Sequence, residues 1–519
     1  MIRDLQKNRI KQFLISIKEP WKVLVLDSRT QDIISPLIKM NELRDCGVTS
    51  HFLISQKRYK ISATPAVYFV SEIDKISQDV IEDLYSVYYI NCINSIKIRS
   101  LEKMGHELSS RGLALRVASV YDQFLDFVSL QEDFFSLEFQ DSFINRQDTD
   151  LLRRTVVSLL SVFVTLEGIP MIYSRDDTSR SIARMLREKI KGTNIIKKTP
   201  KRPLLVLVDR DYDIVSPIQH VWSYSALIDD LLGIRSNKVV LNKDSTKVYD
   251  LDPTDPIWKA NRNEYFPLVV ERVDKEFVEY KKEMALRSID SRSDKKTIQE
   301  ALEKAPELAK KNESVNAHIS MCLEMVEIVK KRSIDDFYKI EKSGYSSEEL
   351  ISISEKGEDI DILRLALSIS SSKEDLAEAL LKKRNIKSSA LEYFRKNSTA
   401  TATANSFSGM VGNIVGNIKK LLPVKETSPI SELVESVYNK IKNQQYSRED
   451  LVDPLDINNI FLNEISSIVV FSVGGATYSE LKTLKVLEEK LKLPIIYGGT
   501  EVLNAAEFIR QIELASSHQ

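Results

Sequence analysis

The sequence predicts a mixed fold, with two α/β regions built on parallel sheets and a mainly helical region inserted between them. Short apolar runs alternate with helical stretches up to about residue 240, a pattern typical of a parallel, doubly wound sheet. Charged helical periodicity dominates from about residue 257 to residue 465. Strand-like runs then return after residue 466, so the helical region is predicted to interrupt an α/β domain.

Composition limits the possible classes of protein. The chain has 519 residues, too many for one hydrophobic core, so two or three domains are expected. Hydrophobic residues make up 43% and charged residues 29%, as in ordinary folded proteins. Lys plus Arg number 74 and Asp plus Glu 75, which gives no electrostatic reason to expect nucleic acid as a partner.

The chain shows no sign of secretion or membrane insertion. Its three cysteines form no CxxC pair, and the charged N-terminus lacks the apolar segment of a signal peptide. The most apolar run, Thr155–Leu166, is shorter than the roughly 20 residues that cross a bilayer, so it predicts a buried helix. We expect a cytoplasmic protein without direct transmembrane insertion, which a partner brings to any membrane where it acts.

The first α/β domain is predicted over residues 1–137. Its strands are expected at Trp21–Leu26, Val48–Ile54, Ala66–Val70 and Tyr88–Cys92, and its helices at Ile33–Cys46, Glu72–Leu84 and Ser95–Ser109. Short strand–helix–strand intervals of this kind favour a parallel sheet.

The second α/β domain is predicted to be discontinuous, over residues 138–240 and 466–519. Its first part holds helices at Leu151–Leu166, Ser179–Gly192 and Ser216–Gly233 and strands at Pro170–Ser174 and Pro203–Val208. Its second part holds strands at Ser467–Val473 and Leu493–Tyr497 and helices at Tyr478–Leu491 and Asn504–Leu514. The C-terminal strands are expected to join the sheet that contains Pro203–Val208.

The third domain, residues 241–465, is predicted to be mainly helical. Helices are expected at Lys275–Lys282, Lys295–Lys311 and Val315–Arg332, and an αα-hairpin at about 257–350 is the simplest arrangement. Residues 397–417 are rich in Ser, Thr, Ala and Gly and predict a mobile loop.

Motifs for catalysis are weak. Asp209 and Asp211 follow a buried strand, as in magnesium-dependent phosphatases, but the position expected to hold Thr or Val is Asp213. Gly474-Gly475 and Gly498-Gly499 lack the spacing of phosphate-binding loops and are interpreted as tight turns. We therefore predict no enzyme, catalytic residue, metal or cofactor, and keep a phosphatase using Asp209 and Asp211 as an alternative.

Two apolar pairs near the end of the first domain suggest a partner site. Leu101 and Met104 are spaced i, i+3 on one predicted helix, with Gly105 beside them, and Val117 and Val120 repeat the spacing on what is expected to be the next helix. Such faces could form a shallow groove for a partner's aromatic side chain or helix. Plain core packing is the alternative interpretation.

Several segments resemble the Sec/Munc (SM) family of syntaxin-binding proteins. They are WKVLVLDSRTQDIISPLIKMNELRDCGVTSHFLI, PLLVLVDRDYDIVSPIQHVWSYSALIDDLLGI, IVVFSVGGATYSE and IIYGGTEVLNAAEFIRQI. The phrases PAVYFV, VYDQFLDFV, FFSLEF and WKANRNEYFPLVVERVDKEFVEYKKE are similar to the Sly branch, which acts between endoplasmic reticulum (ER) and Golgi. The resemblance runs over nearly the whole chain in the family's order.

The resemblance implies an arch of three domains with the insertion predicted above. It implies a function: binding a syntaxin-type (Qa) SNARE through its N-terminal peptide, and chaperoning SNARE assembly, with a vesicle R-SNARE among the partners, for fusion in ER–Golgi transport. It also implies a monomer in the cytoplasm, recruited peripherally to ER and Golgi membranes and vesicles. An SM protein of the vacuolar or plasma-membrane branch is the alternative.

The resemblance also assigns residues to sites. It carries the N-peptide pocket onto Leu101, Met104, Gly105, Val117 and Val120. Met104 and Gly105 stand where the branch has Leu and Ala, which favours a wider or more adaptable pocket.

In the helical hairpin, which holds SNARE helices in this family, Pro306 is implied to be a hinge. A helix start at Ala305-Pro306 is the alternative. The branch's lid over the SNARE-binding surface is expected to be short here, around Ser288–Lys296.

Overall fold

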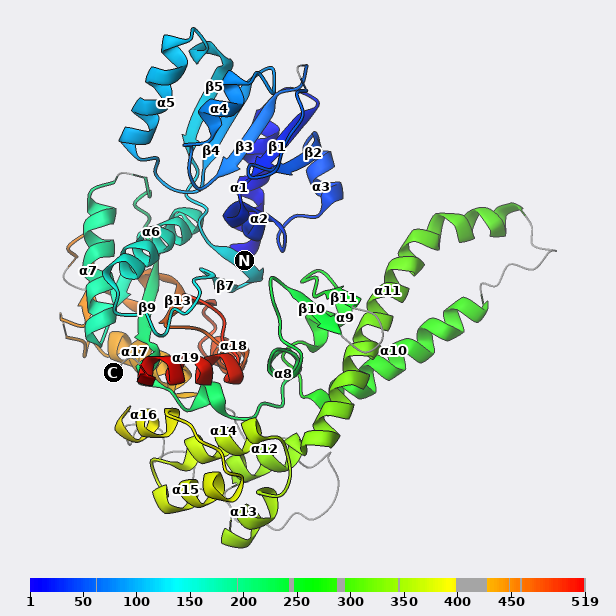
Figure 1. Ribbon diagram of the computed structural model, residues 1–519, viewed down its shortest axis with the longest axis vertical. Helices are drawn as coiled ribbons and strands as arrows, with labels where there is room; N and C mark the ends of the chain where they lie inside the picture. The colour runs from blue at the N-terminus through cyan, green and yellow to red at the C-terminus, as the bar shows by residue number, and fades with distance from the viewer. Residues whose placement is uncertain are drawn as a thin grey trace. The chain divides into compact units, whose positions relative to one another are not determined.

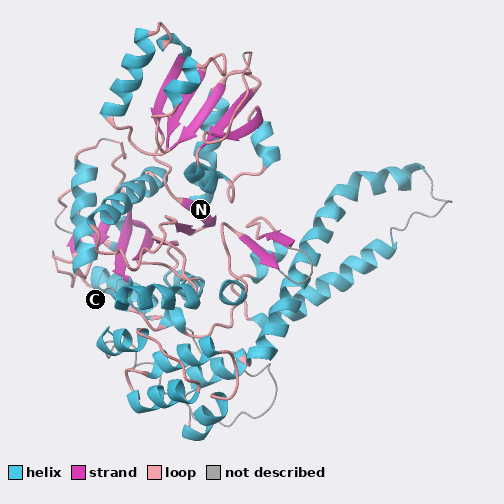
Figure 2. Ribbon diagram, in the orientation of Figure 1, coloured by secondary structure: helices cyan, strands magenta, loops and turns pink. Residues whose placement is uncertain are grey.

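The computed structural model describes residues 1–61, 63–193, 195–241, 247–286, 295–343, 346–397, 427–447, 449–457 and 460–517. The predicted loop at 397–417 and the shortened lid lie almost entirely outside these residues. The chain forms two compact units: Met1–Arg210 with Leu433–Ala476 and Leu487–Val502, and Asp211–Glu432 with Thr477–Val486 and Leu503–Gln519. Figures 1 and 2 show two sheets with flanking helices and a largely helical remainder.

The first sheet has five parallel strands in the order β2-β1-β3-β4-β5. They are β1 (Lys22–Leu26), β2 (Val48–Leu53), β3 (Ala66–Val70), β4 (Tyr88–Cys92) and β5 (Val117–Asp122). Side chains of β1 and β3 are buried along their whole length, because helices cover both faces of such a sheet. The four predicted strands are confirmed, and β5 was not predicted.

Helices α1 (Ile2–Ser16), α2 (Ser28–Ile34), α3 (Met40–Asp45), α4 (Ile76–Ile81) and α5 (Ile98–Ser110) accompany this sheet. The prediction of one helix over Ile33–Cys46 is wrong. The helix ends before Pro36, which has no backbone N–H to continue it, and α3 begins at Met40.

The second sheet has seven strands in the order β12-β8-β9-β13-β14-β7-β6. They are β6 (Val128–Gln131), β7 (Phe134–Ser136), β8 (Met171–Tyr173), β9 (Arg202–Asp209), β12 (Leu451–Val452), β13 (Ile465–Val473) and β14 (Ile495–Gly499). The strand β13 lies between β9 and β14 and is parallel to both. The prediction that the C-terminal strands return to this sheet is therefore confirmed, and so is the insertion of the helical region into its strand order.

The second sheet begins earlier in the chain than expected, with strands β6 and β7. Strand β6 pairs with β7, and β7 pairs with β14, so the first sheet ends with β5 and the second begins at Val128 rather than after residue 137. Both strands are too short to give a clear alternation in the sequence. The division into three domains stays a prediction, because the structure separates only the two units above.

The longest apolar run of the sequence forms a buried helix, as predicted. Helix α6 (Thr149–Leu166) and helix α7 (Asp177–Lys191) pack in one core with the central strands of the second sheet. Helices α18 (Tyr478–Leu491) and α19 (Ala505–Ser517) follow β13 and β14. Among the helices that the structure describes, none combines the length and the apolar character needed to cross a membrane.

Between β9 and β12, the described residues form helices and one small ribbon. Strands β10 (Lys238–Leu241) and β11 (Lys247–Asp250) pair antiparallel. The helices are α8 (Tyr224–Leu231), α9 (Pro256–Asn261), α10 (Phe266–Leu286), α11 (Lys295–Arg332), α12 (Ile334–Ser343), α13 (Ser347–Ile353), α14 (Asp359–Ile369), α15 (Glu374–Lys383), α16 (Ala390–Asn397) and α17 (Pro429–Lys442).

The αα-hairpin is confirmed as the pair α10 and α11, which run side by side (Figure 1). Lys311 Nζ lies 3.1 Å from Glu283 Oε2 across the pair. The two helices predicted at Lys295–Lys311 and Val315–Arg332 are one continuous helix. Pro306 lies within its span, so the alternative that a helix begins at Ala305-Pro306 is wrong.

Two glycine pairs of the second sheet serve different purposes. Gly474 and Gly475 have φ of +92° and +116°, so the predicted turn is confirmed. Gly498 and Gly499 instead lie inside β14, and the prediction of a second turn is wrong. A Cβ on Gly498 would lie 2.2 Å from the Phe135 ring, so this glycine is required for close packing.

Gly498→Ala is therefore expected to destabilise the fold by about 1–3 kcal/mol, the usual cost of overpacking a core. Phe135 is fully buried and stacks on Phe471, with ring centroids 6.0 Å apart, so its ring cannot simply turn away. Gly105→Ala is the matched control, because a Cβ there meets nothing within 4 Å, and alanine suits a helix better by up to about 1 kcal/mol. Denaturant unfolding of both variants tests this, and equal stability of the two would contradict it.

Candidate functional site

The predicted pocket residues lie on α5 and β5, at one edge of the first sheet (Figure 1). Leu101 on α5 is 40% exposed, while Met104, one turn further along, is buried. Gly105 is exposed and leaves open space beside the helix. Val117 and Val120 are half-buried and pack against the same apolar core as Met104. The structure thus brings all five residues to the α5–β5 region.

The valines reach this position in a way that the sequence analysis did not predict. Val117 and Val120 were expected on a helix, but they lie on β5, which follows a short 3-10 turn at Ala114–Arg116. Residues three apart on a regular strand point to opposite faces. Here the register shifts beside Val117, where Tyr88 pairs with Val117 but Tyr89 pairs with Ser119. This bulge lets both valines pack on one core.

Three apolar side chains near this pocket were missed. Ile98 on α5 is 73% exposed, Leu115 is 97% exposed and Tyr121 on β5 is 59% exposed. We define the α5–β5 surface as these three residues together with Leu101, Gly105, Val117 and Val120. The i, i+3 spacing of Ile98 and Leu101 was the only sequence signal for the first of them.

The α5–β5 surface has the properties of a docking site for a short peptide. Strand β5 is an edge strand, paired only with β4 within its sheet, and edge strands leave backbone groups open to a partner. Contiguous exposed apolar surface marks interaction sites, and both α5 and β5 expose large apolar side chains here.

A buried ionic cluster holds the C-terminal end of α11. It consists of His220, Asp230, Arg332, Glu341, Asp361 and Arg364. The His220 Nδ1 lies 2.8 Å from Glu341 Oε1 and its Nε2 lies 3.2 Å from Asp361 Oδ1. Arg332, the last residue of α11, contacts the same Asp361 oxygen at 2.5 Å.

The cluster is balanced only when His220 is protonated. Burial and the nearby Arg364 charge lower the pKa of His220, but the carboxylates of Glu341 and Asp361 outweigh them, so the pKa lies above its ordinary value of 6.5. Burial would raise the pKa values of Glu341 and Asp361, but contacts with His220 hold both below their ordinary values. Three cations then face three anions, which is the condition for a tolerable buried network.

A second polar contact anchors the middle of α11. The Tyr224 hydroxyl on α8 lies 2.8 Å from His318 Nδ1. Burial would raise the pKa of Asp255, but the neighbouring His318 imidazole, with Nε2 3.8 Å from Asp255 Oδ2, helps to lower it to about 2. Asp255 also accepts from the backbone N–H of Ile257 at the start of α9. The middle and the C-terminal end of α11 are thus fixed to neighbouring helices.

The carboxyl edge of the second sheet, where ligands bind in many α/β proteins, is filled by the chain itself. Ser142 donates from its backbone N–H and its hydroxyl to Glu501, at 2.8 and 2.7 Å. The Thr500 hydroxyl accepts from the N–H of Gly474 at 2.9 Å, and Phe143 packs beside that glycine. These contacts occupy the space after β13 and β14.

The two aspartates of the phosphatase alternative have partners of their own. Asp209 lies 3.4 Å from Arg146, and Asp211 accepts a hydrogen bond of 2.6 Å from the Tyr393 hydroxyl. Among the described residues, no group of three or more His, Cys, Asp or Glu side chains is arranged to hold a metal ion. Nothing in the geometry favours the phosphatase.

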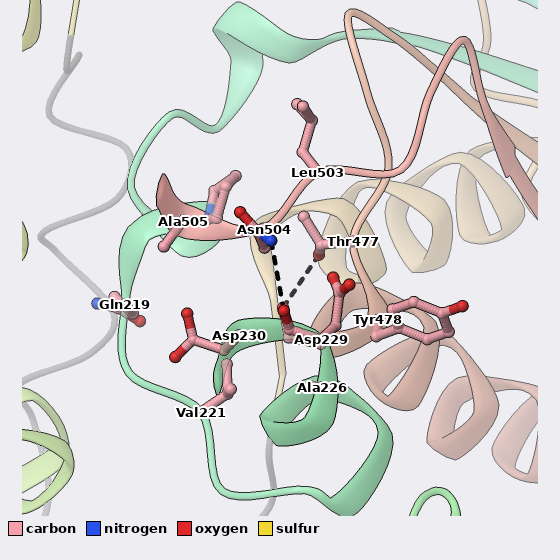
Figure 3. Close-up of a pocket in the computed structure, with 12 residues that line it drawn as sticks. Gln219, Val221, Ala226, Asp229, Asp230, Thr477, Tyr478, Leu503, Asn504 and Ala505 are labelled. Carbon is pink, nitrogen blue, oxygen red and sulfur yellow. Dashed lines mark hydrogen bonds between the residues drawn. The ribbon is translucent and has the colours of Figure 1, made fainter. Parts of the chain in front are cut away.

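A small cavity lies between α8 and the segments that begin α18 and α19 (Figure 3). Its volume is about 20 Å³, room for about one water molecule. Burial raises the pKa of Asp229 in its wall to about 7, and Asn504 donates to the Asp229 backbone carbonyl at 3.3 Å. Binding pockets for small molecules are typically hundreds of Å³, so this cavity suits a structural water.

Comparison with known proteins identifies the family. The sequence profile of the Sec1 family matches residues 22–511. The chain is 56% identical over 517 residues to the SEC1 family transport protein SLY1 of Encephalitozoon cuniculi (strain GB-M1), covering 99% of each chain. The chain belongs to the Sec1 family. The predicted SM family and its Sly branch are confirmed.

Other Sec1 family members support the assignment. The human Sec1 family domain-containing protein 1 is 30% identical, with 96% of this chain and 94% of the human one covered. A crystal structure of Sly1p in complex with an N-terminal peptide of Sed5p matches with a TM-score of 0.82, 25% identity and 99% coverage of both chains. The SM protein Vps45, solved with the Qa SNARE Tlg2, matches with a TM-score of 0.83 at 20% identity and covers 99% of this chain and 98% of its own, which shows the shared fold.

Proposed function

We propose that this chain binds a syntaxin-type Qa SNARE and chaperones SNARE assembly for membrane fusion in ER–Golgi transport. The observation that carries the proposal is the match over 99% of both chains to Sly1p, which was crystallised with an N-terminal peptide of Sed5p. The 56% identity to a Sly1-type transport protein supports the same branch.

The α5–β5 surface is the proposed site for the N-terminal peptide of the Qa SNARE. Leu101, Val117 and Val120 supply an apolar wall, and Gly105 leaves room for an aromatic anchor. Met104 lies buried beneath them and sets the floor. An aromatic side chain placed here removes large apolar area from water on both partners.

The hairpin of α10 and α11 is the proposed site for SNARE helices, including that of a vesicle R-SNARE. The second half of α11 is anchored by His318 and by the buried ionic cluster. Pro306 is proposed as the hinge that lets the hairpin change shape. A rigid base with a hinge above it would hold two helices in register and raise their effective concentration.

The protein is proposed to work by binding alone, without catalysing a reaction. The ion pairing of Asp209 and the hydrogen bond to Asp211 support this, and so does the filled carboxyl edge of the second sheet. We further propose that the chain has three domains, 1–137, 138–240 with 466–519, and 241–465, and is a cytoplasmic monomer recruited to ER and Golgi membranes.

Isothermal titration with the N-terminal peptide of the organism's early-secretory Qa SNARE tests the function. We expect saturable binding that is lost when the peptide's aromatic anchor is replaced by Ala, since burial of that ring supplies most of the apolar area. A scrambled peptide is the control. If folded protein and intact peptide do not bind, the family assignment stands, but binding of the N-terminal peptide at the α5–β5 surface is wrong.

A further inference from the structure

Exposed lysines gather at the amino edge of the second sheet. From Lys189 to Val208 the sequence contains no acidic residue. Helix α7 ends at Lys191 and β9 begins at Arg202, so the connecting loop lies at the edge where the parallel strands start. Four side chains here are exposed and form no ion pair with the described residues: Lys189, Lys197, Lys198 and Lys201.

The described residues of the loop that carries these lysines make specific contacts. Ile196 is 7% exposed and belongs to the core formed by α6, α7 and the central strands. The Thr199 hydroxyl donates to the backbone carbonyl of Lys201 at 2.7 Å. The Thr193 hydroxyl donates to the carbonyl of Lys189 at 3.1 Å. With Ile196 buried, its neighbours Lys197 and Lys198 are held at the surface.

Three large apolar side chains are exposed at the same edge. Ile195 is 41% exposed, Ile457 44% and Phe461 50%. Asp456 lies 2.6 Å from both Arg187 and Lys191, which places the adjoining Ile457 beside the end of α7. Phe461 precedes β13, whose first residue, Ile465, pairs with Arg202 at the start of β9. We call these three residues and the four lysines the amino-edge surface.

We propose that the amino-edge surface docks on the anionic face of a lipid bilayer. Lysine ammonium groups are attracted to lipid phosphates without needing a fixed paired geometry. Exposed Ile and Phe side chains can enter the boundary between headgroups and acyl chains. Two nearby acidic groups are already paired with cations, since Asp456 contacts Arg187 and Lys191 and Glu188 lies 3.5 Å from Arg187.

Other partners fit this surface less well. Protein interfaces are depleted of lysine relative to the rest of the surface, whereas lysine supplies all four free charges here. Nucleic acid binding is favoured by a basic protein, and this chain has a net charge of −1. The mixture of lysine and large apolar residues matches a membrane surface.

Co-sedimentation of the full chain with vesicles tests this. We expect binding to vesicles of phosphatidylcholine with phosphatidylserine, little binding to phosphatidylcholine alone, and loss of binding as salt rises, since salt screens surface charge. The triple variant Lys197→Glu, Lys198→Glu, Lys201→Glu should bind anionic vesicles about tenfold or more weakly. Phe461→Ser should weaken binding less and leave its dependence on salt unchanged, because this substitution removes apolar contact and no charge.

A matched control makes the same change in net charge at three lysines outside the amino-edge surface. Lys18→Glu, Lys57→Glu, Lys387→Glu reverses three exposed lysines elsewhere and should bind like the unmodified chain. All variants should keep their thermal unfolding temperature and their affinity for the Qa SNARE peptide, so a failure of the proposed function would be seen separately. Equal binding to neutral and anionic vesicles, or equal loss in both triple variants, would overturn the proposal. Capture of an acidic peptide without vesicle binding would overturn it too, in favour of a protein partner.

Discussion

Val120→Asp is expected to abolish binding of the Qa SNARE N-terminal peptide. Val120 is half-buried and packs on the apolar core that contains Met104. A carboxylate at this position would lie in an apolar contact without a partner, which costs several kcal/mol once the peptide excludes water. Since each ~1.4 kcal/mol is a tenfold change in affinity, we expect a loss of at least a hundredfold, measured by isothermal titration.

A second variant separates loss of binding from loss of fold. Leu101→Asp changes the helix side of the same surface at a residue that is 40% exposed. It should therefore weaken peptide binding while leaving the free energy of unfolding nearly unchanged. Val248→Asp is the matched control, because Val248 is 56% exposed on β11, away from the α5–β5 surface in sequence. Unchanged peptide affinity in folded Val120→Asp and Leu101→Asp proteins would refute the assignment of the site.

Much of the fold could be predicted because its central strands are buried on both faces. Such strands give continuous apolar runs, as in β1, β3, β9 and β13, and a run of that kind is visible without an alignment. The edge elements were harder. Strand β5 alternates poorly because of its bulge, and β6 and β7 contain only four and three residues. Their place is decided by the pairing of β7 with β14, which lies far along the chain.

The α5–β5 surface was predictable only in part. Helical spacing identified Leu101 and Met104, but their different exposure depends on how α5 lies on the sheet. Leu115 lies in a short turn without periodicity, so nothing local distinguishes it. The buried ionic cluster left no sequence signal at all, because its members come from widely separated segments and each resembles an ordinary surface charge.

The second large effect is expected from a substitution in the buried ionic cluster. His220→Gln should destabilise the folded chain by about 3–5 kcal/mol, the range for breaking a buried charge network. The imidazole is buried, and its two nitrogens face Glu341 and Asp361 at 2.8 and 3.2 Å. A neutral amide leaves the carboxylate of Glu341 without a cation. Denaturant unfolding measures the loss, and His106→Gln, on the exposed face of α5, is the matched control, with little expected change.

The same substitution should change how stability depends on pH. The folded pKa of His220 lies above its unfolded value of 6.5, so its contribution is complete below pH 6.5 and is lost as pH rises through the folded pKa. Glu341 and Asp361 have lowered pKa values, so their contribution is present above their unfolded values and is lost in acid. The difference in the free energy of unfolding between His220→Gln and the unmodified chain should therefore be greatest above the unfolded pKa values of the two carboxylates and below the folded pKa of His220. It should shrink towards alkaline pH. A constant difference from pH 6 to pH 10 would show that His220 is held neutral, and the charge balance assigned to the cluster would then be wrong.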